Sequence, residues 1–344
     1  MAPLTRFLLS LLAAGSSLAV PVAQEVELAG RPGGGGDRLR KSWHSLTNAQ
    51  KKAYIDAELC LMSKPSTSGL RGARTRFDDF QSVHVSLTEI VHYAGQFLPW
   101  HRLFVWAHEQ ALEKECGYKG GQPYWDEPLD AGFFSTSVVL DPVTGFGGNG
   151  VGASRCIADG PFANYTNALG PSYAVNDHCI ERTIMDFVSW ATHAQYRDRC
   201  LAKTSWLDFW TCVEASPHNG GHGGVGSQMS NPISSPGDPL FFLHHAWLDQ
   251  IWAHKGNLTL EFPGDLFPSG IPPPPGFPGS APGGGGPPAP DLTRPADVPE
   301  PVIIGDPANV TTLKHVLQML GLTADRTIAE VMDTRGFMCY RYDV

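Results

Sequence analysis

Apolar residues recur at helical spacing in several stretches of the chain, and segments rich in glycine and proline separate these stretches. In residues 45–63 small and apolar side chains recur every four positions, and Ser45 or Thr47 can cap the amino end, so we predict a helix. The same pattern, interrupted by Gly95 and Pro99, predicts further helices over residues 78–94, 99–114, 181–201, 205–214 and within 238–252.

Two long segments lack helical periodicity. Residues 117–178 are rich in glycine, asparagine, serine and proline, so we expect loops with few short strands that wrap a helical core. Residues 263–301 include 14 prolines and 8 glycines, a composition that cannot bury enough apolar area to fold alone. We interpret them as an insertion or surface loop within a domain of residues 39–344, with a proline-rich recognition segment as the alternative.

Histidines concentrate in residues 217–252. His218 and His222 are four residues apart, and His244 and His245 are adjacent within the apolar run. On a helix, residues four apart lie on one face at about 6 Å, so two imidazoles can converge on one ion. Imidazole suits copper, zinc, iron and nickel, although a single pair of this kind also arises by chance on surface helices.

A second group of histidines lies upstream, where His84, His92 and His101 are separated by eight and nine residues. Two such groups in one chain are hard to explain by chance, and we predict a metal-binding protein. The remaining histidines have no partner at ligand spacing, and we expect structural or exposed positions for His44, His108, His178, His193, His254 and His315.

Composition excludes some classes of protein. A chain of 344 residues with 42% hydrophobic content can form one large domain or two ordinary ones with a sizeable core. The net charge of -9, from 25 basic and 34 acidic residues without a basic run, argues against nucleic acid as a partner. We expect no membrane partner either, because no later stretch reaches transmembrane length.

The first residues have the pattern of a secretory signal. Arg6 precedes a short apolar run, and small residues follow at Ser17 and Ala19. We predict that residues 1–19 are a signal peptide, that residues 20–38 are a flexible leader, and that the protein is secreted. A buried N-terminal helix is the alternative.

Cysteine usage agrees with export. Seven cysteines allow up to three disulfides and leave one cysteine over, and spacing alone leaves the pairing open. No Cys-x-x-Cys pair occurs, which disfavours a zinc ribbon or a thioredoxin site. Three sequons, at Asn164, Asn257 and Asn309, could carry glycans on an exported chain.

Several motifs together resemble the type-3 dicopper proteins, which comprise tyrosinases, catechol oxidases (polyphenol oxidases) and the active-site domain of haemocyanins. The motifs that carry the resemblance are His92 with FLPWHR at 97–102, Glu109, HNxxH at 218–222 and DPLFFLHHAWLDQIW at 238–252. Weaker matches extend the similarity from about residue 40 to 344, with RKSWHSLTNAQKKAYIDAELCL at 40–61, PYWD at 123–126 and YRY at 340–342.

The resemblance implies a mainly α fold in which a four-helix bundle core holds a dinuclear copper centre and long loops wrap it. It implies two sets of copper ligands, His84, His92 and His101 for the first ion and His218, His222 and His245 for the second. Adjacent helical residues point about 100° apart, so only one of His244 and His245 should reach the metal, and the choice of His245 rests on the resemblance. Tyr340 and Tyr342 would pack with Arg40 near the start of the domain.

The resemblance also assigns roles around the copper ions. Glu214 and Asn219 would hold a water that helps to deprotonate an incoming phenol, whose pKa is about 10. The alternative for Glu214 is a carboxylate at a helix end. Asp249 would either accept the free ring N–H of His245 or lie as a charge on the helix surface.

Some positions depart from the family pattern. Gln250 stands where an arginine often follows the aspartate, and Glu127 stands where PYWD often continues with tryptophan, but neither removes a ligand. No cysteine lies close to His92, so we expect no thioether between this histidine and a neighbouring residue. The chain ends two residues after Tyr342, and we expect a short, fungal-type form without the C-terminal lid domain of many relatives.

The expected function is that of a secreted catechol oxidase or tyrosinase that converts o-diphenols to o-quinones and reduces O2 to water. Activity on monophenols or o-aminophenols, the preferred phenol and the oligomeric state stay open. A haemocyanin-like protein that binds dioxygen without turnover shares the ligand pattern and is the main alternative. A dinuclear zinc hydrolase would normally include carboxylate ligands, whereas both groups here consist of histidine.

Overall fold

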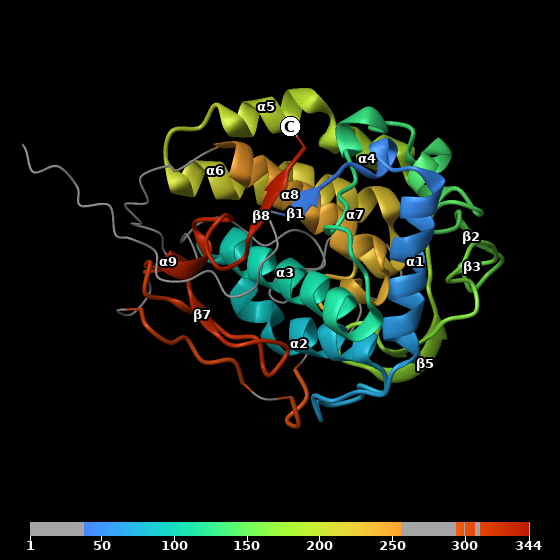
Figure 1. The fold of residues 1–344 in the computed structure, drawn as a ribbon, viewed down its shortest axis with the longest axis horizontal. Coiled ribbons are helices and arrows are strands. Elements are labelled where there is room, and N and C mark those ends of the chain that lie inside the picture. The colour runs from blue at the N-terminus through green and yellow to red at the C-terminus, as the bar shows by residue number, and fades with distance from the viewer. Residues whose placement is uncertain (1–37, 256–293, 299, 307–309, 344) are drawn as a thin grey trace, which may run out of the picture. The chain divides into compact units, whose positions relative to one another are not determined.

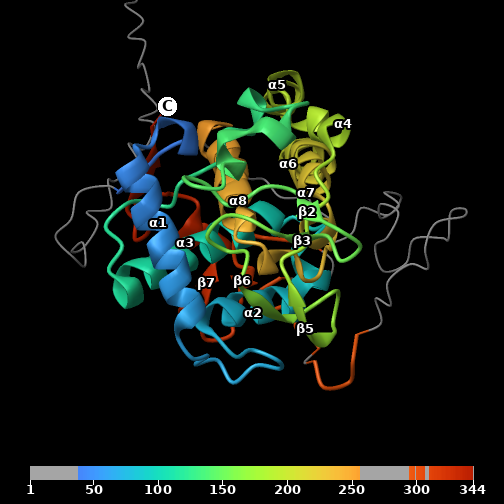
Figure 2. The same cartoon turned by 90° about the vertical axis from the view of Figure 1, so that its right-hand side faces the viewer.

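The computed structural model describes residues 38–255, 294–298, 300–306 and 310–343, which belong to one unit of the chain, 35–344. These residues are mainly helical with a few short strands, as the sequence predicts (Figures 1 and 2). The predicted signal peptide, almost all of the leader and most of the segment 263–301 lie outside the described residues, so these assignments stay predictions. Among the described residues, no helix combines the length and the hydropathy of a membrane span.

Four helices carry the centre of this unit: α2 (Arg76–Val91), α3 (Phe97–Cys116), α7 (Asn219–Val225) and α8 (Leu240–Lys255). Helix α3 packs against α2 and α8, and α7 packs against α8. Helix α8 is apolar around most of its circumference, and it is buried accordingly. Helix α1 (Asn48–Ser63) covers α2 and α3 from outside (Figure 2). The four-helix core that the resemblance implies is therefore present.

Local sequence explains where these helices begin. Thr47, not Ser45, caps α1 by exchanging hydrogen bonds with Gln50, and Thr75 caps α2 in the same way. Helix α3 begins two residues before Pro99, the predicted start. Pro99 therefore lies in the first turn, where its missing N–H leaves no hydrogen bond unmade.

The prediction of one helix over residues 181–201 is wrong. The structure has three short pieces in this region: α4 (Asp186–Ser189), the 3-10 turn η5 (Trp190–Thr192) and α5 (Ala194–Leu201). The buried guanidinium of Arg182 ion-pairs with Asp238 at 2.7 Å and donates to backbone carbonyls of the preceding loop region. These long-range contacts hold the residues before α4 out of a helix, and tertiary structure overrides the local pattern.

The predicted helix over 205–214 is present as α6 (Trp206–Val213), which Ser205 caps. It continues through a π-helical turn, η6 (Glu214–His218), into α7. Pro217 lies inside this turn and cannot donate a backbone hydrogen bond, so the regular α pattern is interrupted here. The interruption sets the direction in which the side chains of η6 point relative to those of α7.

Residues 117–178 are mostly irregular, as predicted. Their 3-10 turns are η2 (Glu127–Leu129), η3 (Phe134–Thr136) and η4 (Val138–Leu140). Two antiparallel pairs accompany them, β2 (Gly150–Val151) with β3 (Cys156–Ile157) and β4 (Thr166–Leu169) with β5 (Val175–Cys179). The other short elements are η1 (Trp43–Ser45), η7 (Ser227–Ser230), η8 (Ser235–Gly237), β6 (Val316–Leu317), β7 (Arg326–Thr327) and α9 (Ile328–Val331).

The two ends of the described chain pair with each other through parallel strands, β1 (Arg38–Arg40) and β8 (Tyr340–Tyr342) (Figure 1). Behind the strands, the buried Arg40 ion-pairs with Asp249 of α8 at 3.2 Å. Tyr340 and Tyr342 donate to the same carboxylate at 2.5 and 2.6 Å. The packing that the resemblance implies for both tyrosines and Arg40 is therefore present.

The structure also resolves the cysteine pairing that the sequence left open. The disulfides are Cys60–Cys116, Cys156–Cys179 and Cys200–Cys212, and they join α1 to α3, β3 to β5 and α5 to α6. Cys339 is the cysteine left over. It is half-buried, and its thiol donates to the backbone carbonyl of Gly336.

Candidate metal centre

The first histidine cluster comprises His84, His92 and His101. His84 lies in the middle of α2, His92 is the residue at which α2 ends, and His101 lies in the second turn of α3. All three are buried, and one ring nitrogen of each lies within 4.8 Å of the others. The turn between α2 and α3 thus brings together residues that are eight and nine positions apart in the sequence.

The second histidine cluster comprises His218, His222, His244 and His245, each of which offers a ring nitrogen within 4.8 Å of the others. His218 closes the π-helical turn and His222 follows one turn later in α7, with ring centroids 4.5 Å apart. His244 and His245 come from α8. The packing of α7 on α8 therefore assembles this cluster.

The two clusters are in contact with each other. The ring of His101 stacks on that of His245, with centroids 4.2 Å apart and planes inclined by 10°. The rings of His92 and His218 also face each other, at 5.9 Å. The structure thus brings all six predicted ligands into one place, and their individual assignment as ligands stays a prediction.

Backbone carbonyls orient several of these imidazoles through Nδ1. The pairs and their distances are His84 with Ile233 at 2.8 Å, His92 with Thr88 at 3.0 Å, His101 with Phe97 at 2.8 Å and His222 with Met229 at 2.6 Å. A ring that donates from Nδ1 carries its lone pair on Nε2. Among the described residues, no hydrogen-bond partner reaches Nε2 of His84 or His101, or either ring nitrogen of His218. Such a donor set fits metal ions.

Burial keeps these histidines neutral. It lowers the pKa of His92 to about 4 and the pKa of His244 to about 3. Burial, with neighbouring histidines adding to it, lowers the pKa well below the ordinary value for His84, His101, His218, His222 and His245. Neutral imidazole is the form that binds metal, so these rings can bind an ion without first releasing a proton.

The adjacent His244 and His245 have different surroundings. His245 stacks on the first cluster, and its Nε2 lies 3.2 Å from Nε2 of His222. His244 instead has its Nδ1 at 2.6 Å from a carboxylate oxygen of Glu127, and both residues are fully buried. The sequence singled out Glu127 only as a departure from the family pattern and gave no signal of this contact.

Glu214, one of the two predicted catalytic residues, begins the π-helical turn, and Asn219, the other, directly follows it as the first residue of α7. Glu214 is buried, and one of its carboxylate oxygens accepts a hydrogen bond of 2.8 Å from the backbone N–H of Tyr93. Its other oxygen has no hydrogen-bond partner among the described residues, and burial raises the pKa of the Glu214 carboxyl group to about 8. Burial, with Glu214 adding to it, raises the pKa of the Tyr93 phenol, and the nearby side chain of Asn219 partly offsets this rise.

The sequence did not identify Tyr93 as a residue of the site. It directly follows His92 and has a φ of 52°, a left-handed conformation that a residue other than glycine rarely adopts. Its backbone N–H donates to Glu214 and its phenol lies near Asn219, so Tyr93 interacts with both predicted catalytic residues. Its position after a predicted ligand is the one signal that could have drawn attention to it.

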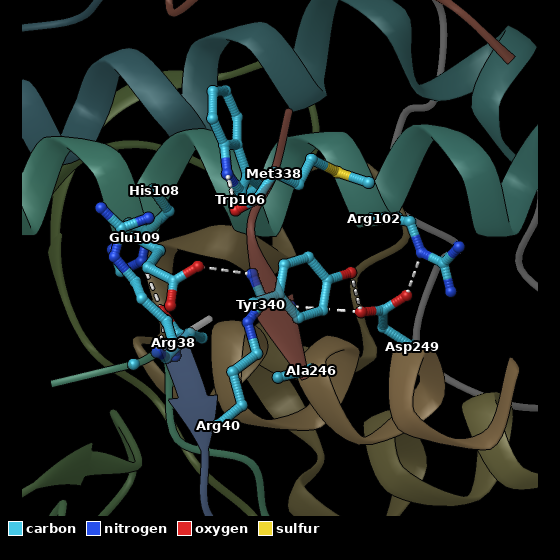
Figure 3. Close-up of polar contacts among 12 residues, drawn as sticks. Arg38, Arg40, Arg102, Trp106, His108, Glu109, Ala246, Asp249, Met338 and Tyr340 are labelled. Atoms are coloured by element: carbon cyan, nitrogen blue, oxygen red, sulfur yellow. Dashed lines mark hydrogen bonds and ion pairs between the residues drawn. The ribbon is translucent and has the colours of Figure 1, made fainter. Parts of the chain in front are cut away.

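Both predictions for Asp249, as a hydrogen-bond partner of His245 or as a charge on the helix surface, are wrong. The carboxylate does not accept a hydrogen bond from His245, and it is buried rather than on the helix surface. Figure 3 shows it between Tyr340 and Arg102, whose Nε lies 2.5 Å away. Asp249 thus belongs to the ionic network behind β1 and β8 and not to the histidine clusters.

The remaining histidines are structural or exposed, as expected. His108 is buried, stacks on Phe242 at 3.6 Å and hydrogen-bonds to Glu58 and Gln122 through its two ring nitrogens. His44 and His315 bond to aspartates, and His193 caps α5. His178 is half-buried and His254 is exposed.

Comparisons with known proteins agree with this geometry. Residues 74–254 match the model of the common central domain of tyrosinase. The chain is 33% identical to the tyrosinase-like protein phomQ1' of Diaporthe leptostromiformis, over 89% of this chain and 79% of that protein. It is 32% identical to tyrosinase ustQ of Aspergillus flavus, over 88% and 79% of the two chains.

Two further similarities extend the comparison. The N-acetyl-6-hydroxytryptophan oxidase ivoB of Emericella nidulans is 28% identical over 89% of this chain and 92% of that protein. A solved polyphenol oxidase of Thermothelomyces thermophila superposes with a TM-score of 0.69 at 30% identity, over 89% and 88% of the two chains. With its two buried histidine clusters and its four-helix core, this chain belongs to the tyrosinase family of type-3 copper proteins.

Proposed function

We propose that this member of the tyrosinase family is a dicopper oxidase that converts o-diphenols to o-quinones. In balanced form, two o-diphenols and one dioxygen give two o-quinones and two waters. The observation that carries the proposal is the direct contact of two all-histidine clusters, in which His101 stacks on His245 at 4.2 Å. Bound copper would supply the redox chemistry, because two ions side by side can each pass one electron to dioxygen.

The proposed ligands are His84, His92 and His101 for one ion and His218, His222 and His245 for the other. Five of these rings are buried and His222 is half-buried, and this, their neutral state and the backbone carbonyls that orient four of them support the assignment. His245 is preferred to His244 because its ring contacts the first cluster while Glu127 engages the ring of His244.

We assign proton transfer to Glu214. A phenol, with a pKa of about 10, must lose a proton before its oxygen can approach a metal ion. Glu214 is a buried carboxylate four residues before His218, and one of its oxygens is held by Tyr93 while the other has no partner among the described residues. Because burial raises the pKa of Glu214 to about 8, the carboxyl group becomes ionised as the pH rises through about 8, and in that form the second oxygen can accept a proton from the substrate.

Asn219 and Tyr93 are proposed to position this reaction. The phenol of Tyr93 lies near Asn219, and its backbone N–H donates to Glu214, so a change in one of these residues should alter the position of the others. The relatives phomQ1' and ustQ are named tyrosinase-like protein and tyrosinase, and ivoB is named N-acetyl-6-hydroxytryptophan oxidase, which supports a phenolic substrate for this chain.

Oxygen consumption by the copper-loaded protein tests the proposal. We expect uptake with 4-methylcatechol, and parallel assays with tyrosine and o-aminophenol define the range of substrates. His101→Ala should abolish uptake, whereas His108→Gln, a change at a buried histidine outside both clusters, should retain it. A wild-type protein that binds dioxygen reversibly but consumes none with any of the three phenols would contradict an oxidase and favour a haemocyanin-like carrier.

We also propose that the protein is secreted. Three disulfides support an oxidising compartment, and the sequon residue Asn164 is exposed, while Asn257 and Asn309 lie outside the described residues. Expression of the full chain in a eukaryotic host should release protein that begins near residue 20. Protein that stays inside the cell with residue 1 intact would contradict secretion.

A further inference from the structure

One segment of the chain, residues 226–238 between α7 and α8, contacts both histidine clusters through its backbone. The carbonyl of Met229 lies 2.6 Å from Nδ1 of His222, in the second cluster. The carbonyl of Ile233 lies 2.8 Å from Nδ1 of His84, in the first cluster. Because the two carbonyls are so close in the sequence, the conformation of this short stretch sets the orientation of one ring in each cluster.

The same segment lies beside a further predicted ligand. The hydroxyl of Thr88 in α2 donates to the carbonyl of Pro232 at 2.8 Å. The backbone carbonyl of Thr88 in turn lies 3.0 Å from Nδ1 of His92. Two successive residues of the segment, Pro232 and Ile233, therefore contact α2 next to ligands of the first cluster.

The side chain of Asn231 sets the conformation of the segment. Its oxygen accepts hydrogen bonds from the backbone N–H groups of Ile233 and Ser234, at 3.1 and 3.0 Å, which is the geometry of an Asx turn. Its amide group donates to the hydroxyl of Ser172 at 3.1 Å and so ties the turn to the loop between β4 and β5. The residue whose N–H Asn231 binds is thus the one whose carbonyl orients His84.

Gln228 holds the segment together from its other end. Its side-chain amide donates to the carbonyl of Ser234 at 2.7 Å and links the turn that contains Met229 to the residue after Ile233. The amide of Gln81 in α2 donates to the same carbonyl at 2.8 Å. All five side chains are buried, so the loss of one of these bonds would leave a buried polar group without a partner, which is costly.

The backbone carbonyls select one tautomer of the rings that they contact. A carbonyl only accepts, so the ring nitrogen that faces it carries the proton and the lone pair lies on Nε2. Nε2 of His84 has no hydrogen-bond partner among the described residues, and Nε2 of His222 lies 3.2 Å from Nε2 of His245. A ring that lost its carbonyl could place its proton on Nε2, the atom that the proposed ion needs.

We propose that Asn231 and Gln228 are positioning residues that serve both metal sites at once. They hold residues 226–238 in the conformation in which backbone carbonyls fix the Nδ1–H tautomer of His84 and of His222, and each acts through the backbone of this segment. The inference rests on the proposed dicopper centre and goes beyond it, because loosening one segment should weaken both ions together.

Two measurements on the full chain test this inference. Nitrogen NMR of the histidine rings in the metal-free protein reports the tautomers, and competition with a chelator reports the affinity for each copper ion. Asn231→Ala should shift His84 and His222 away from the Nδ1–H tautomer. It should also weaken both copper ions by roughly 10-fold or more, the size of effect typical for outer partners of metal-bound histidines.

Two further variants sharpen the test. Asn231→Asp keeps an oxygen that can accept the same two N–H bonds, so it should restore the tautomers and both affinities. Gln228→Met breaks a different bond of the same segment and should act as Asn231→Ala does, which keeps the test decisive if one of these variants does not fold.

Asp141→Ala is the matched control. Asp141 is half-buried like Asn231, and its side-chain oxygen also accepts from the backbone N–H groups two and three residues later, Val143 at 2.9 Å and Thr144 at 2.6 Å. It lies outside both clusters, so this variant should keep the tautomers and both copper affinities.

The inference is wrong if Asn231→Ala and Gln228→Met keep the wild-type tautomers and affinities, or lower only the melting temperature of the metal-free protein. Weakening of one ion alone would also contradict a role at both sites. A wild-type protein that binds fewer than two ions would instead refute the proposed function, and the tautomers of the metal-free variants would still test the contacts of the segment.

Discussion

The chain holds 13 histidines, and the role of each depends on the partners of its two ring nitrogens. In His84 and His101, Nδ1 hydrogen-bonds to a backbone carbonyl, and Nε2 has no hydrogen-bond partner among the described residues. His108, equally buried, has both nitrogens engaged and serves packing. Sequence spacing grouped the clustered histidines as the structure places them, but it could not foresee the contacts of Tyr93 or Glu127, because these arise between segments far apart in the chain.

A single substitution tests the proton acceptor. Glu214→Gln keeps the size of the side chain and removes its ability to take a proton, so kcat/KM for 4-methylcatechol should fall by about 100-fold or more, the usual contribution of a general base. Copper content should not change, because Glu214 is not among the proposed ligands. Glu58→Gln removes another buried carboxylate and should leave kcat/KM close to wild type. Equal activity of Glu214→Gln and wild type would rule out this role.

At the scale of elements, one irregular turn and one close helix contact shape the site. The π-helical turn that contains Pro217 places Glu214 and His218 at its two ends. Helix α7 then approaches α8 closely because Gly221 has no side chain. The sequence predicted α6, the helix before this turn. It did not predict that residues 181–201 form short pieces instead of one helix, because the buried ion pair of Arg182 with Asp238 joins segments far apart in the chain.

Gly221→Ala tests the close contact of α7 and α8. The added methyl group would overlap the ring of His244, so the free energy of unfolding should fall by about 1–3 kcal/mol, the usual cost of overpacking. Urea unfolding of the metal-free protein measures the change. Gly148→Ala is the control, because its Cβ would meet the nearest atom at an ordinary 3.5 Å. Equal losses in both variants would show that the contact is not specific.

At the scale of the whole described unit, a buried ionic network joins its first and last strands to α8. Asp249 contacts Arg40 and Arg102 and accepts a hydrogen bond from Tyr340 (Figure 3). It also accepts one from Tyr342. Burial alone would raise the pKa of Asp249, but the two arginines and the tyrosine hydroxyls outweigh it and lower the pKa below the ordinary value. The carboxylate therefore stays ionised and stabilises the folded state near neutral pH.

Asp249→Asn should remove this stabilisation in a pH-dependent way. Since the folded pKa lies below the unfolded one, the contribution of Asp249 is complete above about pH 4 and is lost as pH falls through the folded pKa. Breaking a buried ion pair costs about 3–5 kcal/mol, so urea unfolding at pH 7 should show a loss of that size. The difference between variant and wild type should shrink at pH 3. A difference independent of pH would contradict the account.

The sequence predicted the fold class, three of the four core helices (all but α7) and the two histidine groups, because helical periodicity and motif spacing are local signals. The disulfide pairing and the position of Asp249 depended on tertiary packing and were not predictable in this way. Its position four residues after His245 suggested Asp249 as a partner of that histidine, yet the arginines and tyrosines beside β1 and β8 bind its carboxylate.

Copper content per chain, determined by metal analysis of the copper-loaded protein, tests the central claim most directly. The two histidine clusters predict two ions per chain in the wild type. They also predict that His101→Ala and His218→Ala each lose at least one ion, while His108→Gln keeps both. A wild-type protein with one ion or none, or two ions retained in both cluster variants, would contradict a dinuclear centre built from these histidines.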